Sequence, residues 1–140
     1  MRIIVGYGNE LRGEDAFGVD VVKELEKKSL KETKLISTFL LTPELVLELL
    51  DADEIIFIDA AYSEQNQYAL ASLVLEESES NLSYNLTPKS VMQMLQSLYN
   101  LTPKYLVYSL LTNNFETIGD QVLYKEAVLK VAQDLIIEKN

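Results

Sequence analysis

The chain contains no cysteine and no histidine among its 140 residues. Without cysteine there are no disulfides, no thiolate metal ligands and no cysteine nucleophile. Without histidine the chain lacks the usual general base, the Ser-His-Asp relay and the commonest nitrogen ligand for metals. Any catalytic chemistry must therefore come from carboxylates, hydroxyls, amides, lysine or arginine.

Long hydrophobic runs and an excess of positive charge are also missing. No apolar run approaches the roughly 18 residues that a membrane-spanning helix needs. Residues 1–6 read as a short strand before a glycine loop, not as a signal peptide. We therefore expect a cytoplasmic protein that does not bind membranes. The net charge of −10 argues against a nucleic-acid partner, because phosphate backbones need a basic surface.

Short apolar segments alternate with segments of helical periodicity along almost the whole chain. This alternation predicts one α/β domain over residues 1–140, in three layers: a mainly parallel five-stranded sheet with helices on both faces. The expected strands are Arg2 to Val5, Lys34 to Leu40, Glu54 to Ala60, Tyr68 to Glu76 and Lys104 to Leu111. The expected helices are Asp15 to Lys28, Thr42 to about Asp51, Lys89 to Tyr99 and Asp120 to Glu138.

The segment GYGNELRGEDAFG, residues 6–18, follows the first expected strand and leads into a helix. Its glycines first suggest a dinucleotide site, which has the pattern G-x-G-x-x-G. Here Gly6 and Gly8 are followed by Leu11 where the third glycine should stand. An acidic loop would also repel a pyrophosphate, so we exclude dinucleotide binding.

Two acidic strand ends are the main candidates for chemistry. Glu14 and Asp15 lie where the first strand gives way to a helix, and Asp59 ends the third strand. Helix capping and turn formation are the structural explanations for such acids. However, ligands of open α/β sheets bind at the carboxyl ends of the strands, and strands one and three are expected to be neighbours. Carboxylates there hold a metal or share a proton, as in aspartic-type hydrolysis.

The same segment resembles the N-terminal signature of the hydrogenase maturation endopeptidases, roughly G-x-G-N-x-L-x-x-D-[DE]-x-x-G. Six positions match, and Glu14 replaces the first acid conservatively. The matching residues are Gly6, Gly8, Asn9, Leu11, Asp15 and Gly18. Residues 41–45 (LTPEL) and 52–60 (ADEIIFIDA) are similar to the middle segment of the family, and residues 82–95 to a later helix start.

This resemblance implies an endopeptidase that cleaves the C-terminal extension of the large-subunit precursor of a [NiFe]-hydrogenase. No permanently bound cofactor is implied, because nickel arrives on cysteines of the precursor. Asp15 and Asp59 fall on the metal-contacting acids of the family and would be the catalytic residues. Substrate-binding roles are expected for residues of the glycine loop, namely Gly6, Gly8, Asn9 and Glu14.

The third metal contact of the family is a histidine, and this chain has none. Tyr84 stands at that position, or Asn85 if the register slips by one residue. Nickel and zinc favour nitrogen and sulfur ligands, so an all-oxygen set would hold them weakly by itself. Two alternatives to the nickel-dependent endopeptidase therefore stay open: a non-cleaving assembly factor that binds a hydrogenase subunit, and a metal-independent aspartic-type peptidase.

Overall fold

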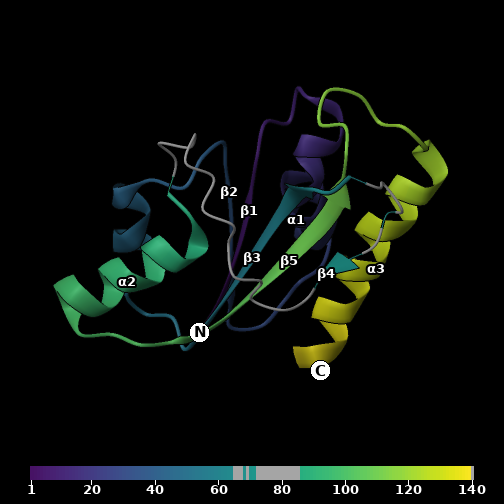
Figure 1. Cartoon of the computed structure of the whole chain (residues 1–140). Helices are drawn as coiled ribbons and strands as arrows, with labels where there is room; N and C mark the ends of the chain where they lie inside the picture. Colours follow the sequence, from purple (N-terminus) through teal and green to yellow (C-terminus); the bar gives the residue numbers. More distant parts are fainter. Residues whose placement is uncertain (65–67, 69, 72–85, 140) are drawn as a thin grey trace.

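The computed structural model describes residues 1–64, 68, 70–71 and 86–139 of the chain. Their centre is a sheet in the order β2-β1-β3-β5-β4 (Figure 1). Four strands run parallel to one another: β1 (Arg2–Tyr7), β2 (Thr33–Thr38), β3 (Glu54–Tyr62) and β5 (Lys104–Thr112). The fifth, β4 (Leu70–Ala71), pairs antiparallel with β5. The predicted α/β class and mainly parallel sheet are confirmed: four strands are parallel, and the fifth is a two-residue antiparallel strand.

Helices cover both faces of the sheet (Figure 1). One face is packed by α1 (Phe17–Glu26) and the long C-terminal helix α3 (Gln121–Lys139). The other is packed by the 3-10 helix η2 (Pro43–Glu48) and by α2 (Pro88–Tyr99). The central strands β1 and β3 are apolar on both sides because each lies between two layers, which is typical of parallel sheets.

Element boundaries differ from the predicted ones mainly at helix starts. The helix expected from Asp15 begins with a separate 3-10 turn, η1 (Gly13–Ala16), before α1. Thr87 caps α2, and its hydroxyl accepts a hydrogen bond of 3.1 Å from the amide of Ser90. Thr42 makes no such bond, and the segment after it forms only a 3-10 helix. Of the strand expected over 68–76, only Leu70–Ala71 lies within the described residues as a strand.

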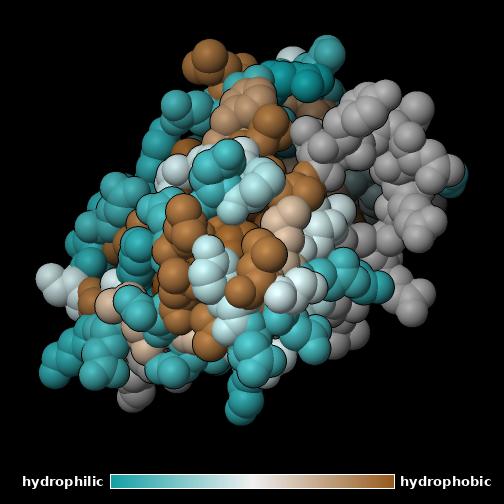
Figure 2. Space-filling view, turned by 90° about the vertical axis from the view of Figure 1, so that its left-hand side faces the viewer, coloured by the Kyte–Doolittle hydropathy of each residue, from teal (hydrophilic) through white to brown (hydrophobic). Residues whose placement is uncertain are grey.

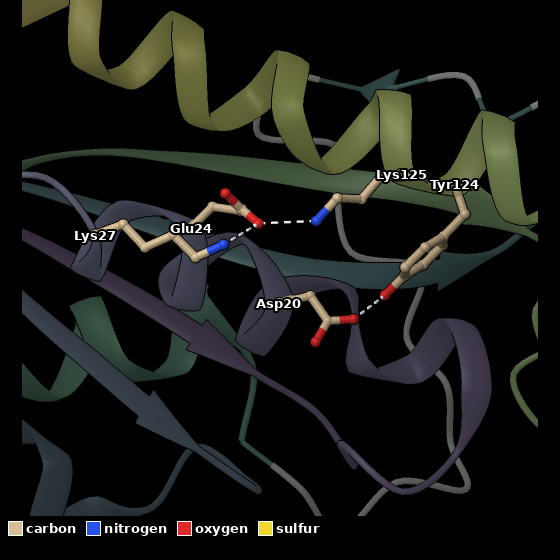
Figure 3. A network of polar contacts seen from close by, with 5 residues as sticks. All are labelled: Asp20, Glu24, Lys27, Tyr124 and Lys125. Atoms are coloured by element: carbon tan, nitrogen blue, oxygen red, sulfur yellow. Dashed lines mark hydrogen bonds and ion pairs between the residues drawn. The ribbon is translucent and has the colours of Figure 1, made fainter.

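Polar side chains join α1 to α3 across their outer surface (Figure 3). The carboxylate of Glu24 accepts hydrogen bonds from Lys125 at 2.8 Å and from Lys27 at 3.0 Å, and these two cations hold the pKa of Glu24 below its ordinary value. Tyr124 donates to Asp20 at 2.6 Å. Burial, and then the hydrogen bond to Asp20, raise the pKa of Tyr124 well above its ordinary value. This seam fixes α1, and therefore the loop that precedes α1, against α3.

Candidate active site

The glycine loop turns sharply where β1 ends. Gly8 has a φ of +142°, a conformation open to glycine but strained for other residues. The Asn9 side chain then folds back on the loop, and its Oδ1 accepts a hydrogen bond of 2.9 Å from the amide of Leu11. In the structure the Asn9 side chain therefore holds the loop, and its expected substrate-binding role stays a prediction.

Asp15 lies in η1 and is half-buried at the end of this turn. Its Oδ2 accepts a hydrogen bond of 3.1 Å from the backbone amide of Asn9. A methyl group at Gly8 would lie 2.1 Å from the carbonyl oxygen of Asp15, so only glycine lets the loop approach so closely. The glycine at position 8 therefore positions the Asp15 carboxylate at the carboxyl end of β1.

Asp59 occupies the equivalent end of the neighbouring strand. On β3 it lies opposite Ser109 of β5, whose hydroxyl donates a hydrogen bond of 2.5 Å to Oδ1. The hydroxyl of Tyr7, from β1, donates to Oδ2. Asp59 is half-buried, and both of its oxygens are held by hydroxyl groups from the two adjoining strands.

The structure thus brings Asp15 and Asp59 to one end of the sheet, as predicted. Tyr7 holds Asp59 and Asn9 holds Asp15, so both carboxylates lie against the same three-residue segment. Within the part of the chain that the structure describes, no group of three acidic, histidine or cysteine residues is arranged to hold a metal ion. Tyr84 and Asn85, the candidates for a third ligand, lie outside the described residues.

Glu14 has a different environment from the one expected. Its side chain is fully buried, and Oε2 accepts hydrogen bonds from Tyr68 Oη at 2.6 Å and from the amide of Gly119 at 2.9 Å. Oε1 accepts one from the Thr112 hydroxyl. The predicted substrate-binding role needs a carboxylate that faces the crevice, whereas this one faces inward and ties η1 to the end of β5 and to the start of α3.

Gly6 is also placed differently from its expected role. A methyl group there would lie 2.1 Å from the carbonyl oxygen of Gly18 in α1, and one at Gly18 would lie 2.0 Å from that of Ile58 in β3. These two glycines allow the start of α1 to pack directly on the sheet. Gly6 therefore contributes to helix–sheet packing, and Gly8 is the glycine of the motif that borders the crevice.

Tyr7 and Ser109 were missed as site residues by sequence reasoning. A tyrosine inside G-x-G and a serine in an apolar strand carry no local signal of a role. The pairing register of the strands supplies the signal. Gly6 of β1 pairs with Ile58 of β3, and the next residue of β3, Asp59, pairs with Ser109 of β5. Pairing registers come from the fold, so this network was not predictable from spacing.

A cavity of about 350 Å³, here called the loop cavity, opens at the glycine loop, where it is lined by Asn9, whose amide donates to Asp15. It is bounded by the glycine loop, α1 and the end of β2, with the lining residues Gly8, Asn9, Glu10, Leu11, Val19, Ser37, Thr38 and Phe39. Leu11 and Phe39 are strongly exposed apolar side chains. In Figure 2 apolar atoms also stand at the top of the molecule, the end at which β1 and β2 terminate. The cavity offers an apolar side chain a place next to the loop that holds the Asp15 carboxylate.

No family model and no curated protein sequence matches the chain. Solved structures do match it over nearly its whole length. The [NiFe] hydrogenase maturation protease HycI from Thermococcus kodakarensis KOD1 has a TM-score of 0.76 and 20% sequence identity, covering 97% of this chain and 90% of that one. The hydrogenase maturating endopeptidase HybD from E. coli has a TM-score of 0.75 and 19% identity, covering 98% and 90%.

A third match covers almost every residue of both chains. The [NiFe] hydrogenase maturation protease HybD from Thermococcus kodakarensis has a TM-score of 0.74 and 16% identity, covering 99% of both chains. The chain therefore has the fold of several hydrogenase maturation proteases, which confirms at the level of the fold the resemblance carried by the glycine loop. In the described residues no helix is both long and apolar enough to cross a membrane.

Proposed function

We propose that this protein is an endopeptidase that removes the C-terminal extension of a nickel-loaded [NiFe]-hydrogenase large-subunit precursor. One observation supports the proposal: in a chain with the fold of maturation proteases, Asp15 follows β1 and Asp59 lies near the end of the adjoining strand β3, and both are half-buried. These are also the positions at which the sequence resembles the metal-contacting acids of that family.

In the proposed reaction the nickel ion is part of the substrate. Cysteines of the precursor supply the sulfur ligands that nickel prefers, so the protease has only to add oxygen ligands. Asp15 and Asp59 do this, and the attacking water is activated by a carboxylate or by the metal. The hydroxyls of Tyr7 and Ser109 each donate a hydrogen bond to Asp59 and fix the orientation of its carboxylate.

The absence of histidine favours a second candidate, a non-cleaving assembly factor that binds the precursor through the same crevice. A metal-independent aspartic-type peptidase is the third reading, and a chelator would leave its activity unchanged.

Incubation with the nickel-loaded precursor from the same organism separates these functions. The wild-type protein and Asp59→Asn are compared, and the intact mass of the precursor is recorded over time. The proposal predicts loss of the C-terminal extension with the wild type only, and no loss once a chelator has stripped the nickel. Stable binding without a mass change supports the assembly factor, whereas cleavage that survives the chelator supports the aspartic-type peptidase.

A further inference from the structure

β2 is an edge strand whose outer side has no partner strand among the described residues. The order of the sheet places β1 on its inner side alone, and β2 lies at the margin of the sheet in Figure 1. An edge of this kind presents a row of backbone donors and acceptors that pair readily with an extended segment of another chain.

Alternation along the strand identifies the residues that face outward. The amide of Arg2 donates to the carbonyl of Glu32, and the amide of Gly8 donates to that of Thr38 at 3.1 Å. The even-numbered positions of β2 therefore pair with β1. Because backbone groups of a parallel strand alternate between its two sides, Leu35 and Ser37 direct their amide and carbonyl groups outward. Ser37 is also exposed.

Two cavities lie along this edge and meet at Ser37 and Thr38. The loop cavity lies at the carboxyl end of β2, next to the loop whose Asn9 amide donates to Asp15. The second, here called the edge cavity, has a volume of about 390 Å³. Its lining consists of Lys34, Leu35, Ile36, Ser37, Thr38, Thr42, Glu44, Leu45 and Glu48. An extended segment on the outer side of β2 would thus run from the edge cavity into the loop cavity.

Three carboxylates line this path, and two of them are already paired with lysines. Glu10 of the loop cavity lies 3.1 Å from Lys23, and Glu44 and Glu48 line the edge cavity together with Lys34. Lys34 lies 3.9 Å from Glu48, so its charge is already compensated. Glu44 has no ion pair among the described residues and remains available to a cation on a partner. The groove therefore complements a segment that carries a basic residue.

We propose that the precursor segment next to the cleavage site binds as an added strand on the outer edge of β2. One apolar side chain of the segment enters the loop cavity against Leu11 and Phe39, and a basic side chain lies near Glu44. The bond between Gly8 and Thr38 joins the end of β2 to the loop that holds Asp15, so a segment that follows β2 arrives at the acids. This inference rests on the proposed function and adds to it the conformation and chemistry of the substrate.

The direct test removes the outward backbone amide of Ser37 and leaves the hydrogen bonds between β2 and β1 in place. Ser37→Pro eliminates the outward amide, and Ser37→Ala, which keeps it, is the matched control. With the nickel-loaded precursor as substrate, we expect Ser37→Pro to raise KM about tenfold or more and to change kcat by less than about twofold. Ser37→Ala removes only the hydroxyl and should raise KM much less than Ser37→Pro does. An unchanged KM in a folded Ser37→Pro variant, checked by circular dichroism, would overturn the added strand.

A second pair of variants keeps the test decisive if proline disturbs the fold. Phe39 is 57% exposed, so Phe39→Asp should fold as well as Phe39→Leu. The aspartate should raise KM for the precursor about tenfold, and the leucine should not, because only the aspartate opposes an apolar occupant. Equal KM values for these two variants would contradict occupation of the loop cavity.

The remaining outcomes separate this inference from the proposed function. Normal cleavage by all four variants would leave the endopeptidase intact and reject the β2 edge as its substrate path. Absence of both binding and cleavage in the wild type would reject the two proposals together. A wild-type dimer in sedimentation experiments that Ser37→Pro abolishes, with no change in KM, would show that a second copy of the chain occupies the edge instead.

Discussion

Glu14 and Asp15 are consecutive acids in one 3-10 turn, yet their surroundings are opposite. Glu14 is 0% exposed, and its carboxylate accepts hydrogen bonds from groups of three segments far apart in the sequence. Asp15 is half-buried, and its carboxylate accepts a hydrogen bond from the amide of Asn9 in its own loop. One acid therefore fixes the loop to the protein, whereas its neighbour is left available at the crevice.

This contrast shows that a pair of adjacent carboxylates is not automatically a chemical unit. Successive side chains of a helical turn point in different directions, so Glu14 and Asp15 cannot both face one ligand. The partner of Asp15 comes instead from β3, the neighbouring strand, in the form of Asp59. The buried acid supports this arrangement indirectly, because it anchors the turn that carries Asp15.

The largest expected difference between the two acids is in catalysis. Asp15→Asn should lower cleavage of the nickel-loaded precursor roughly 1,000-fold, because it removes a carboxylate proposed to act at the reacting centre. Glu14→Gln should retain most of the activity. The glutamine oxygen can still accept from Tyr68 and Gly119, and its NH₂ group can donate to the Thr112 hydroxyl oxygen. Initial rates measured by intact mass give both values. Comparable losses in the two variants would remove the proposed division of roles.

Stability should show the reverse order. Glu14→Ala leaves the Tyr68 hydroxyl and the Gly119 amide without their acceptor and creates a cavity beside them. We therefore expect it to lower the free energy of unfolding by about 3 kcal/mol. Asp15→Ala should cost less than about 1 kcal/mol, because its carboxylate is partly solvated. Urea denaturation of the two variants measures this difference, and a larger loss at Asp15 would contradict the anchoring role of Glu14.

Gly8 lies against Asp15 and Gly119 lies near Glu14, so a substitution at each glycine disturbs one of the two acids. Gly8→Ala combines a φ of +142° with a methyl group 2.1 Å from the Asp15 carbonyl, so we expect a loss of about 2 kcal/mol and a displaced Asp15. Gly119→Ala is the milder control. Its methyl group would lie 3.0 Å from Tyr68 Oη, and we expect a loss below about 1 kcal/mol. Thermal unfolding gives the stabilities, and cleavage should fall with Gly8→Ala alone.

The smallest expected effect concerns Tyr124, whose pKa is raised by burial, by its hydrogen bond to Asp20 and by the negative charges of Asp20, Glu14 and Asp15. The folded protein keeps the phenolic proton that the unfolded chain loses near its ordinary pKa of about 10. The contribution of Tyr124 is therefore complete below about pH 10 and declines as the pH rises further.

Tyr124→Phe should lower the free energy of unfolding by about 1 kcal/mol at neutral pH, because one hydrogen bond to a carboxylate is lost. The difference from the wild type should shrink above about pH 10, in line with the sign derived for this group. Urea denaturation at several pH values measures it. A difference that grows with pH would contradict the raised pKa.

The sequence predicted the parts of the fold that depend on periodicity. Alternating apolar segments gave the α/β class and the positions of β1, β3 and β5, and acidic strand ends indicated Asp15 and Asp59. It did not distinguish Glu14 from Asp15, because the donors that bury Glu14 come from residues 68, 112 and 119. Nor did it indicate the Tyr7 and Ser109 hydroxyls on Asp59, since only the register of three strands brings them together.

The most direct test of the account is the intact mass of the large-subunit precursor after incubation with the wild-type protein, in nickel-loaded and nickel-free form. The account predicts that the C-terminal extension is lost from the nickel-loaded form alone, and that Asp15→Asn prevents this loss whereas Glu14→Gln does not. A nickel-loaded precursor that stays at its full mass with the wild-type protein would contradict it.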